Sequence, residues 1–258
     1  MNDYLKRSNK FSEMFKDKTQ LLIVDIDNTL IGNQQAVHRF AEVFDKMHSY
    51  TGFGIASGRR LDSAVNILRE WQTPTPELWI TSVGSEINYG PSLLKNKEWE
   101  LHIKEQWQPE AIQELLKATP GLTQQPAVVQ RPYKISFDVM DSVGFNLSEL
   151  EERFHQHNIL ANIIYSHGKH VDVLPHRASK GKAIQFISEQ LNFPAHKILV
   201  AGDSGNDTEM LKTEMAGVVV GNYSQELEDL KKTDGIYFAQ KTYADGIIEG
   251  LFHYNFIR

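Results

Sequence analysis

The sequence predicts a doubly wound α/β domain that carries an inserted α+β module. Short apolar runs alternate with amphipathic segments, which is the pattern of buried parallel strands connected by helices. The apolar runs lie at residues 21–24, 52–56, 78–82 and 197–201, and the amphipathic segments at 61–71 and 180–191. In the middle of the chain, residues 133–139 and 163–174 instead alternate polar and apolar side chains. That alternation is typical of half-exposed antiparallel strands.

The change of pattern divides the chain. We expect residues 1–89 and 177–258 to form the core domain and residues 90–176 to form the inserted module. The helix that contains Lys180 then marks the return of the chain to the core. A chain of 258 residues is long enough for a main domain with a smaller one.

Composition excludes several classes of protein. With 41% hydrophobic and 23% charged residues, the chain is an ordinary globular protein and not a disordered one. The net charge of −6 is spread along the chain without a basic stripe, which argues against a nucleic acid as partner. Since there is no cysteine, disulfides, thiolate catalysis and cysteine-ligated metals are excluded.

Residues 1–20 are polar and charged, without the apolar core of a signal peptide, and no run of about 18 apolar residues occurs. We therefore expect a cytoplasmic protein that does not bind membranes, and a monomer. The first 20 residues are interpreted as an ordinary flexible extension or as part of a tether to a glycosyltransferase partner, and the first interpretation is favoured.

Polar clusters follow three of the apolar runs. Because the carboxyl ends of parallel strands meet at one edge of a sheet, we expect these clusters to converge there. They are Asp25-Ile26-Asp27-Asn28-Thr29, Ser57-Gly58-Arg59 and Gly202-Asp203-Ser204-Gly205-Asn206-Asp207. Four carboxylates at one edge repel one another unless a cation neutralises them, and Mg²⁺ is the natural choice where all ligands are oxygens.

Each of these residues also has an ordinary structural interpretation. Ser57 and Gly58 are suited to cap the helix that begins near Arg60, and Lys180 to be a solvated charge in Ser179-Lys180-Gly181-Lys182. Gly202 and Gly205 are suited to turns. We interpret the histidines at 38, 155 and 157 as surface residues.

Taken together, residues 25–30, Ser57-Gly58-Arg59, Lys180 and residues 202–207 resemble the four-motif signature of the haloacid dehalogenase phosphatases. The resemblance covers most of the chain. It implies a Rossmann-like core with an inserted type-C2 cap, and phosphate transfer with Mg²⁺ as cofactor. The set of motifs in this order is far more specific than any one of them.

The resemblance also implies a role for each motif residue. Asp25 is expected to be the nucleophile that forms an aspartyl-phosphate, and Asp27 the general acid and base. The remaining motif residues divide between metal and phosphate. The expected metal ligands are Asp25, Asp27 through its backbone carbonyl, Asp203, Asn206 and Asp207, and the expected phosphate contacts are Ser57, the Gly58 amide and Lys180.

Three further segments narrow the resemblance: Val83-Gly84-Ser85-Glu86-Ile87, Tyr133-Lys134-Ile135-Ser136 and residues 168–175. They look like the sucrose-phosphate phosphatases, the phosphatase part of bacterial sucrose-phosphate synthases and the mannosylfructose-phosphate phosphatases. A small sugar phosphate, a disaccharide that carries fructose 6-phosphate, is the implied substrate.

By position, Glu86, Lys134 and Arg177 are the candidate sugar contacts, with Ser136, Asp138, Lys169 and Asp172 as weaker ones. Asp138 and His170 stand where the cyanobacterial members carry other residues, so a strict preference for sucrose does not follow. Three alternatives stay open: a related phosphatase for trehalose phosphate, mannosyl-phosphoglycerate or a hexose phosphate, a non-catalytic sugar-phosphate sensor, and a receiver-like module.

Overall fold

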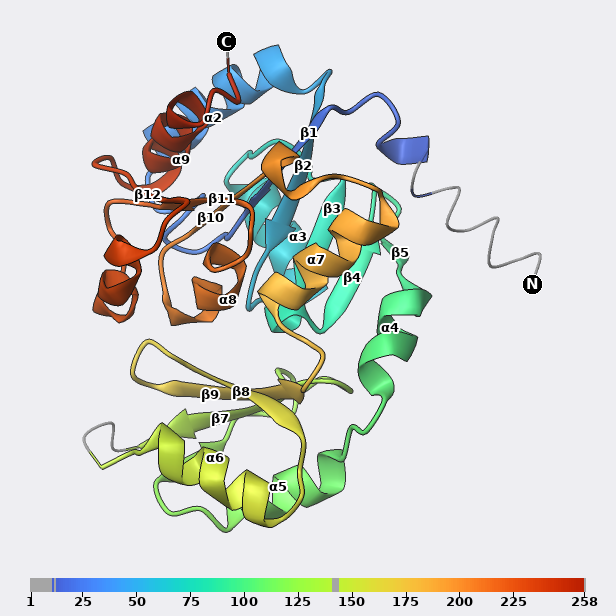
Figure 1. The fold of residues 1–258 in the computed structure, drawn as a ribbon, viewed down its shortest axis with the longest axis vertical. Helices are drawn as coiled ribbons and strands as arrows, with labels where there is room; N and C mark the ends of the chain where they lie inside the picture. The colour runs from blue at the N-terminus through green and yellow to red at the C-terminus, as the bar shows by residue number, and fades with distance from the viewer. Residues whose placement is uncertain (1–10, 12, 141–143, 258) are drawn as a thin grey trace, which may run out of the picture.

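The computed structural model describes residues 11, 13–140 and 144–257. Two sheets organise these residues (Figure 1). The larger sheet has the strand order β12-β11-β10-β1-β2-β3-β4-β5, in which neighbours from β12 to β3 pair in parallel and β4 and β5 join in antiparallel fashion. Its strands are β1 (Gln20–Val24), β2 (Thr51–Ala56), β3 (Leu78–Thr81), β4 (Glu86–Tyr89), β5 (Leu94–Lys95), β10 (Ile198–Gly202), β11 (Ala216–Val219) and β12 (Ile236–Phe238). The doubly wound α/β core predicted from the apolar runs is confirmed.

Helices cover both faces of the larger sheet because its central strands are apolar on both sides. In β1, Leu22 and Val24 face one helical layer, whereas Leu21 and Ile23 face the other. The first layer contains α2 (Gln34–Met47), α3 (Leu61–Glu70) and α9 (Tyr243–His253). The second contains α4 (Lys97–Lys104), α7 (Lys180–Gln190) and α8 (Thr208–Leu211).

The smaller sheet is antiparallel, with the order β6-β7-β9-β8. It consists of β6 (Leu122–Gln124), β7 (Ile135–Val139), β8 (Ala161–Ser166) and β9 (His170–Pro175). Helices α5 (Pro109–Lys117) and α6 (Leu147–Gln156) pack on its apolar face, and the opposite, polar face looks towards the larger sheet (Figure 1). An α+β module is thereby inserted into the core, as the alternating segments predict.

The polar positions of the smaller sheet are more buried than expected. Lys134 and Ser136 were predicted on the exposed side of a strand, yet both are buried. The reason is the hydrogen bonding beneath the polar face, where the Ser136 hydroxyl and the Lys134 ammonium both donate to Asp172 Oδ1, at 2.5 and 3.1 Å. At Lys134 and Ser136 this face is therefore an interior surface, whereas Asp138 and His170 of the same face are each 43% exposed.

The domain boundaries at residues 90 and 176 stay predictions. After the first of them, β5 still pairs with β4 in the larger sheet, and Trp99 of α4 lies in the same apolar core as α7. Of residues 1–20, which were expected to form a flexible extension or part of a tether, residues 1–10 and 12 lie outside the described residues. The described part is not an extension, because Phe15 is buried and β1 begins at Gln20. Phe11 is buried and stacks on Tyr89, with 4.0 Å between ring centroids.

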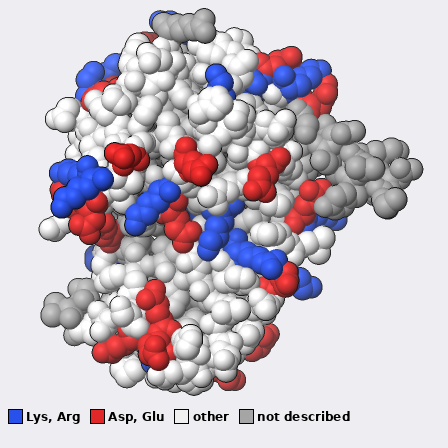
Figure 2. Space-filling model, in the orientation of Figure 1, with Lys and Arg blue, Asp and Glu red and all other residues white. Residues whose placement is uncertain are grey.

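The surface carries charges of both signs. Figure 2 shows acidic and basic side chains interspersed on the visible face. The three histidines at 38, 155 and 157 are exposed, as expected. Within residues 11–257, as far as they are described, no helix has the length and apolar character that crossing a bilayer requires.

Candidate active site

Asp25 lies directly after β1, in the middle of the larger sheet. Its backbone amide continues the strand pairing by donating to the Ala201 carbonyl at 2.9 Å, so the carboxylate is carried at the strand's carboxyl end next to β10. Only 5% of Asp25 is exposed. The buried apolar run that precedes it therefore fixes the position of a carboxylate that points into the site.

Lys180 reaches the same place from the first turn of α7. The side chain of Ser179 caps this helix by accepting from the Lys182 amide at 3.0 Å. The Lys180 ammonium is fully buried and donates to Asp25 Oδ1 at 2.7 Å, to Asp207 Oδ1 at 2.6 Å and to Asn206 Oδ1 at 2.7 Å. The interpretation of Lys180 as a solvated surface charge is wrong.

The loop after β10 brings two more carboxylates to Asp25. Asp203 accepts from the Thr29 hydroxyl at 3.0 Å, and Asp207 Oδ2 accepts from the amides of Asp203 and Ser204 at 3.0 and 3.1 Å. One carboxylate oxygen from each of Asp25, Asp203 and Asp207 lies within 4.8 Å of the others. All three residues are buried, and all donors are oxygens, so the cluster suits a hard divalent cation.

Without a cation, keeping the buried carboxylates of Asp25 and Asp203 ionised costs free energy, and their pKa values are raised accordingly. Burial raises the pKa of Asp25 well above its ordinary range, and the neighbouring Lys180 ammonium only partly offsets that rise. Burial, with the Asp207 carboxylate, also raises the pKa of Asp203, from its ordinary value of 3.8 to about 7. For Lys180 burial works in the opposite direction, but Asp207 and Asp25 outweigh it and raise the pKa of the ammonium.

These shifts predict how stability depends on pH. A carboxyl whose pKa is higher in the folded than in the unfolded chain favours folding below both values, and that contribution is lost as the pH rises through the folded value. For Asp203 the loss falls between 3.8 and about 7. We expect metal-free wild-type protein to lose thermal stability relative to an Asp203→Asn variant over this range, and Mg²⁺ to restore it increasingly as the pH rises.

Differential scanning calorimetry of both proteins in EDTA and in Mg²⁺ measures this difference. The Asp203→Asn variant serves as the reference because it shares every other titrating group with the wild type. A constant difference in Tm between the two metal-free proteins from about pH 4 to about pH 8 contradicts the raised pKa of Asp203.

Asp27 and Ser57 lie beside this cluster. The Asp27 carboxylate accepts two hydrogen bonds of 2.7 Å each from the Arg59 guanidinium, whose third contact is Ser63 Oγ at 3.0 Å. Ser57 is buried, and its Oγ accepts from the Arg59 amide at 3.2 Å. The interpretation of Ser57 as a helix cap is wrong, since α3 begins at Leu61 and its N-cap, Arg60, accepts no capping hydrogen bond.

Gly202 and Gly205 do more than form turns, because neighbouring atoms leave no room for a side chain at either position. A Cβ on Gly202 would lie 2.5 Å from the Asp207 carboxyl carbon, and one on Gly205 would lie 2.6 Å from Glu226 Oε2 and 3.2 Å from the Tyr165 carbonyl of β8. The loop that carries Asp203 and Asp207 is thus held from within and is also contacted by the smaller sheet.

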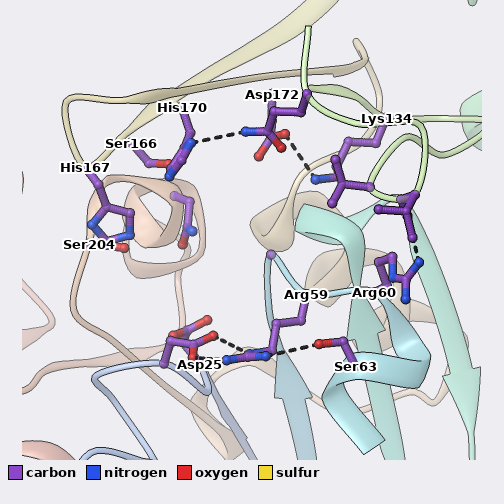
Figure 3. Close-up of a pocket in the computed structure, with 16 residues that line it drawn as sticks. Asp25, Arg59, Arg60, Ser63, Lys134, Ser166, His167, His170, Asp172 and Ser204 are labelled. Carbon is purple, nitrogen blue, oxygen red and sulfur yellow. Dashed lines mark hydrogen bonds and ion pairs between the residues drawn. The ribbon is translucent and has the colours of Figure 1, made fainter. Parts of the chain in front are cut away.

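A cavity of about 470 Å³ lies between the two sheets. Figure 3 shows Asp25, Arg59 and Ser63 on the larger-sheet side, opposite Lys134, His170 and Asp172 on the side of the smaller sheet. The motif residues on its floor are Asp25, Asp27, Gly58, Arg59, Ser204 and Asn206, whereas Ser57, Lys180, Asp203 and Asp207 are buried and do not line it. Its roof is polar apart from Val128 and Val129. The lining side chains are Asp25, Asp27, Gly58, Arg59, Arg60, Ser63, Gln125, Val128, Val129, Lys134, Ser166, His167, His170, Asp172, Ser204 and Asn206.

The predicted sugar contacts divide into two groups. Lys134 and Asp172 line the cavity, and Asp138 lies behind its wall, accepting from Gln125 at 2.7 Å and from His170 Nδ1 at 2.9 Å. The other candidates, Glu86, Arg177, Ser136 and Lys169, do not line the cavity. Glu86 accepts hydrogen bonds from Thr81 and Ser82, and Arg177 pairs with Glu105. Ser136 is buried and donates to Asp172.

Several lining residues were not singled out from the sequence. Gln125, Ser166 and His167 come from loops and strand ends of the inserted module, where no motif marks them. Arg59 was quoted only as part of the Ser57 motif, although an arginine directly after it was a usable signal for a partner of the adjacent carboxylates. The sequence did not indicate how the inserted module is positioned over the core.

Comparison with known proteins agrees with the motif set. The model of the family described as sucrose-6F-phosphate phosphohydrolase matches residues 18–255. Sucrose-phosphatase 2 of Nicotiana tabacum is 30% identical over 250 residues, covering 91% of this chain and 59% of the tobacco protein. The mannosylfructose-phosphate phosphatase of Agrobacterium fabrum is 31% identical over 242 residues, covering 91% of this chain and 96% of that protein.

Among solved structures, the sucrose-phosphatase of Synechocystis in complex with sucrose and phosphate is similar with a TM-score of 0.87 and 32% identity, over 92% of this chain and 98% of the other. Hydrolases of the haloacid dehalogenase superfamily share the fold at 17–18% identity. The chain spans only 59% of the length of the plant relatives that it matches, so it corresponds to part of those proteins.

Proposed function

The chain belongs to the sucrose-6F-phosphate phosphohydrolase family, and from that premise we propose that it is a magnesium-dependent phosphatase that hydrolyses sucrose 6-phosphate to sucrose and phosphate. One observation carries the proposal. Asp25, Asp203, Asp207 and Lys180 form a buried cluster of charges, and Asp25 connects this cluster to the floor of a cavity whose roof is largely polar. Such a floor suits a phosphoryl group with its cation, and such a roof suits sugar hydroxyls.

In the proposed first step, Asp25 attacks phosphorus. A bond forms between its carboxylate oxygen and phosphorus, the bond from phosphorus to the sugar oxygen breaks, and Asp27 donates a proton to that departing oxygen. Lys180 and Ser57 would stabilise charge on the phosphoryl oxygens. Arg59 would orient Asp27, because it holds both oxygens of that carboxylate in the resting site.

In the second step, Asp27 takes a proton from a water molecule whose oxygen attacks the phosphorus of the aspartyl-phosphate. The bond from phosphorus to the Asp25 oxygen breaks, which releases phosphate and regenerates the carboxylate. The oxygens of Asp25, Asp203 and Asp207, with the Asp27 carbonyl and Asn206, would hold Mg²⁺. When bound, Mg²⁺ would neutralise charge on the carboxylate and the phosphoryl oxygens.

A mannosylfructose phosphate is the second candidate substrate. The similarity to the Agrobacterium mannosylfructose-phosphate phosphatase, which extends over 96% of that protein, favours it. His170 lines the roof of the cavity and contacts Asp138 behind it, and both stand where other residues are expected in the cyanobacterial sequences. The glycosyltransferase partner and the monomeric state remain predictions.

Phosphate release from four sugar phosphates tests the proposal. We expect release only with Mg²⁺, and a kcat/KM for sucrose 6-phosphate at least about tenfold above that for fructose 6-phosphate, which lacks the second ring that the roof would contact. Mannosylfructose 6-phosphate and trehalose 6-phosphate complete the set at equal concentration. Preference for the mannosyl compound would select the second candidate, and no metal-dependent release from any of the four would refute a phosphatase of this kind.

A further inference from the structure

The connection between β3 and β4 has an unusual backbone. Ser82, Val83 and Gly84 form one short 3₁₀ turn, η1 (Ser82–Gly84), and have successive φ angles of 52°, 58° and 92°. Left-handed conformations are disfavoured for L-residues, and for a β-branched residue such as Val83 they are rare. Backbone of this kind persists only where its surroundings fix it, and it concentrates at functional sites.

One side of this turn holds the loop that carries Ser57. The Ser82 amide donates to the Arg59 carbonyl at 2.7 Å, and the Val83 amide donates to the Ser57 carbonyl at 3.0 Å. Right-handed backbone at residues 82 and 83 would direct these two amides elsewhere. The left-handed turn thus fixes the main chain on both sides of Gly58.

The other side of the turn contacts the beginning of α7. A Cβ on Gly84 would lie 2.2 Å from the carbonyl carbon and oxygen of Ser179 and 2.6 Å from the Lys180 amide nitrogen. Glycine is therefore required twice, for its φ of 92° and for the absence of a side chain. The backbone of Lys180 rests directly on the turn.

Neighbouring side chains hold the turn in this conformation. The Trp99 indole donates to the Gly84 carbonyl at 3.0 Å, and the Ser85 hydroxyl donates to the Ser82 carbonyl at 2.9 Å. The Ser82 hydroxyl donates to Glu86 Oε2 at 3.1 Å. Glu86, predicted as a sugar contact, here supports the turn.

We propose that the left-handed turn Ser82–Gly84 is a positioning element that sets Ser57 and Lys180 at a fixed separation, so that both meet the same phosphoryl group. The inference rests on the proposed function, since it takes the roles of Ser57 and Lys180 from it. No residue of the turn needs to touch the substrate: the turn acts through the two segments it contacts.

Two variants test the turn, and one serves as control. Gly84→Ala places a methyl group against the Ser179 backbone, and Trp99→Phe keeps an aromatic ring in the core but removes the donor to the Gly84 carbonyl. Val37→Ala removes buried volume from α2, on the opposite face of the larger sheet. For each, kcat and KM are measured with sucrose 6-phosphate, the affinity for orthovanadate by calorimetry, and Tm.

We expect kcat to fall about tenfold in Trp99→Phe and about 100-fold in Gly84→Ala, because small displacements of positioning groups have large effects on rate. Vanadate, which adopts the five-coordinate geometry of a phosphoryl group in transfer, should bind more weakly by similar factors. The ratio of kcat/KM between sucrose 6-phosphate and fructose 6-phosphate should not change. Val37→Ala should lower Tm alone.

A purely structural turn would behave differently. If Trp99→Phe lowers Tm as Val37→Ala does but leaves kcat and vanadate affinity at wild-type values, the inference is overturned, whether or not Gly84→Ala folds. If wild-type protein hydrolyses no sugar phosphate but binds vanadate, the proposed function fails, and weaker vanadate binding by the variants would still support the turn. If the wild type neither hydrolyses any of the four sugar phosphates nor binds vanadate, both the proposed function and the inference about the turn are overturned.

Discussion

Replacing Asp25 with asparagine should lower kcat at least about 10⁴-fold, with the fold intact. The amide has the shape of the carboxylate but cannot attack phosphorus, so no aspartyl-phosphate forms. Its oxygen can still accept the hydrogen bond of 2.7 Å from Lys180. Since burial raises the pKa of Asp25 well above its ordinary range, the neutral amide should also leave the metal-free protein at least as stable as the wild type.

Steady-state phosphate release measures the loss of kcat, and calorimetry measures the stability of the metal-free protein. Asp45→Asn is the matched control, because it makes the same chemical change on an aspartate of α2 whose side chain is 84% exposed. Turnover by Asp25→Asn within tenfold of the wild type in the presence of Mg²⁺ is incompatible with Asp25 as the nucleophile.

Replacing Lys180 with methionine should have the second-largest effect, on both activity and stability. The ammonium has no exposed surface, and its two ion pairs, at 2.7 Å to Asp25 and 2.6 Å to Asp207, balance a site that is otherwise acidic. Without it, two buried carboxylates lose their partner. Breaking buried pairs of this kind typically costs about 3–5 kcal/mol of stability, and loss of a charge that stabilises the transition state costs about 10²–10³ in kcat.

Lys182→Met is the control for this variant. Lys182 lies two positions later in the same helix, and its ammonium donates to the His176 carbonyl at 2.7 Å, outside the site. Chemical denaturation of both variants in EDTA and in Mg²⁺, together with kcat, separates the contribution of Lys180 to stability from its contribution to turnover. Mg²⁺ should restore part of the stability that Lys180→Met loses, but it should not restore kcat. Equal stability and equal kcat in the two variants would contradict a role for the Lys180 ammonium in balancing the site or in catalysis.

The core of the site was predictable from the sequence because its signals are local. The buried run at residues 21–24 predicts a central strand, and Asp25 directly after it therefore lies at the strand's carboxyl end. The same argument places Asp203 after β10. Parallel pairing of β1 with β10 then brings the two carboxylates together, as the convergence of strand ends requires.

The roof of the cavity was less predictable because it depends on contacts between distant parts of the chain. Lys134 was expected to contact the substrate and does line the cavity, whereas Glu86 is engaged with Thr81 and Ser82, and Arg177 with Glu105. Periodicity predicts which side chains of β7 share a face. It does not predict that Asp172 covers Ser136, since that depends on the pairing of β7 with β9.

The turn at residues 82–84 could not be predicted from the sequence, for a different reason. Sequence periodicity extended the third strand through Ser82, but the strand ends at Thr81 and the backbone becomes left-handed at the next residue. A serine and a valine carry no signal for that conformation. Only the contacts with the Ser57 loop and with α7 explain it.

Trapping of the phosphorylated enzyme tests the central claim most directly. Wild-type protein is mixed with sucrose 6-phosphate labelled in its phosphate and with Mg²⁺, quenched in acid during the first turnover, and digested for peptide mapping. We predict that the label is bound to Asp25 as an acyl phosphate that hydroxylamine removes, and that sucrose is released before phosphate. Label on another residue, or equal release of sucrose and phosphate from the first turnover without labelled protein, would contradict the mechanism.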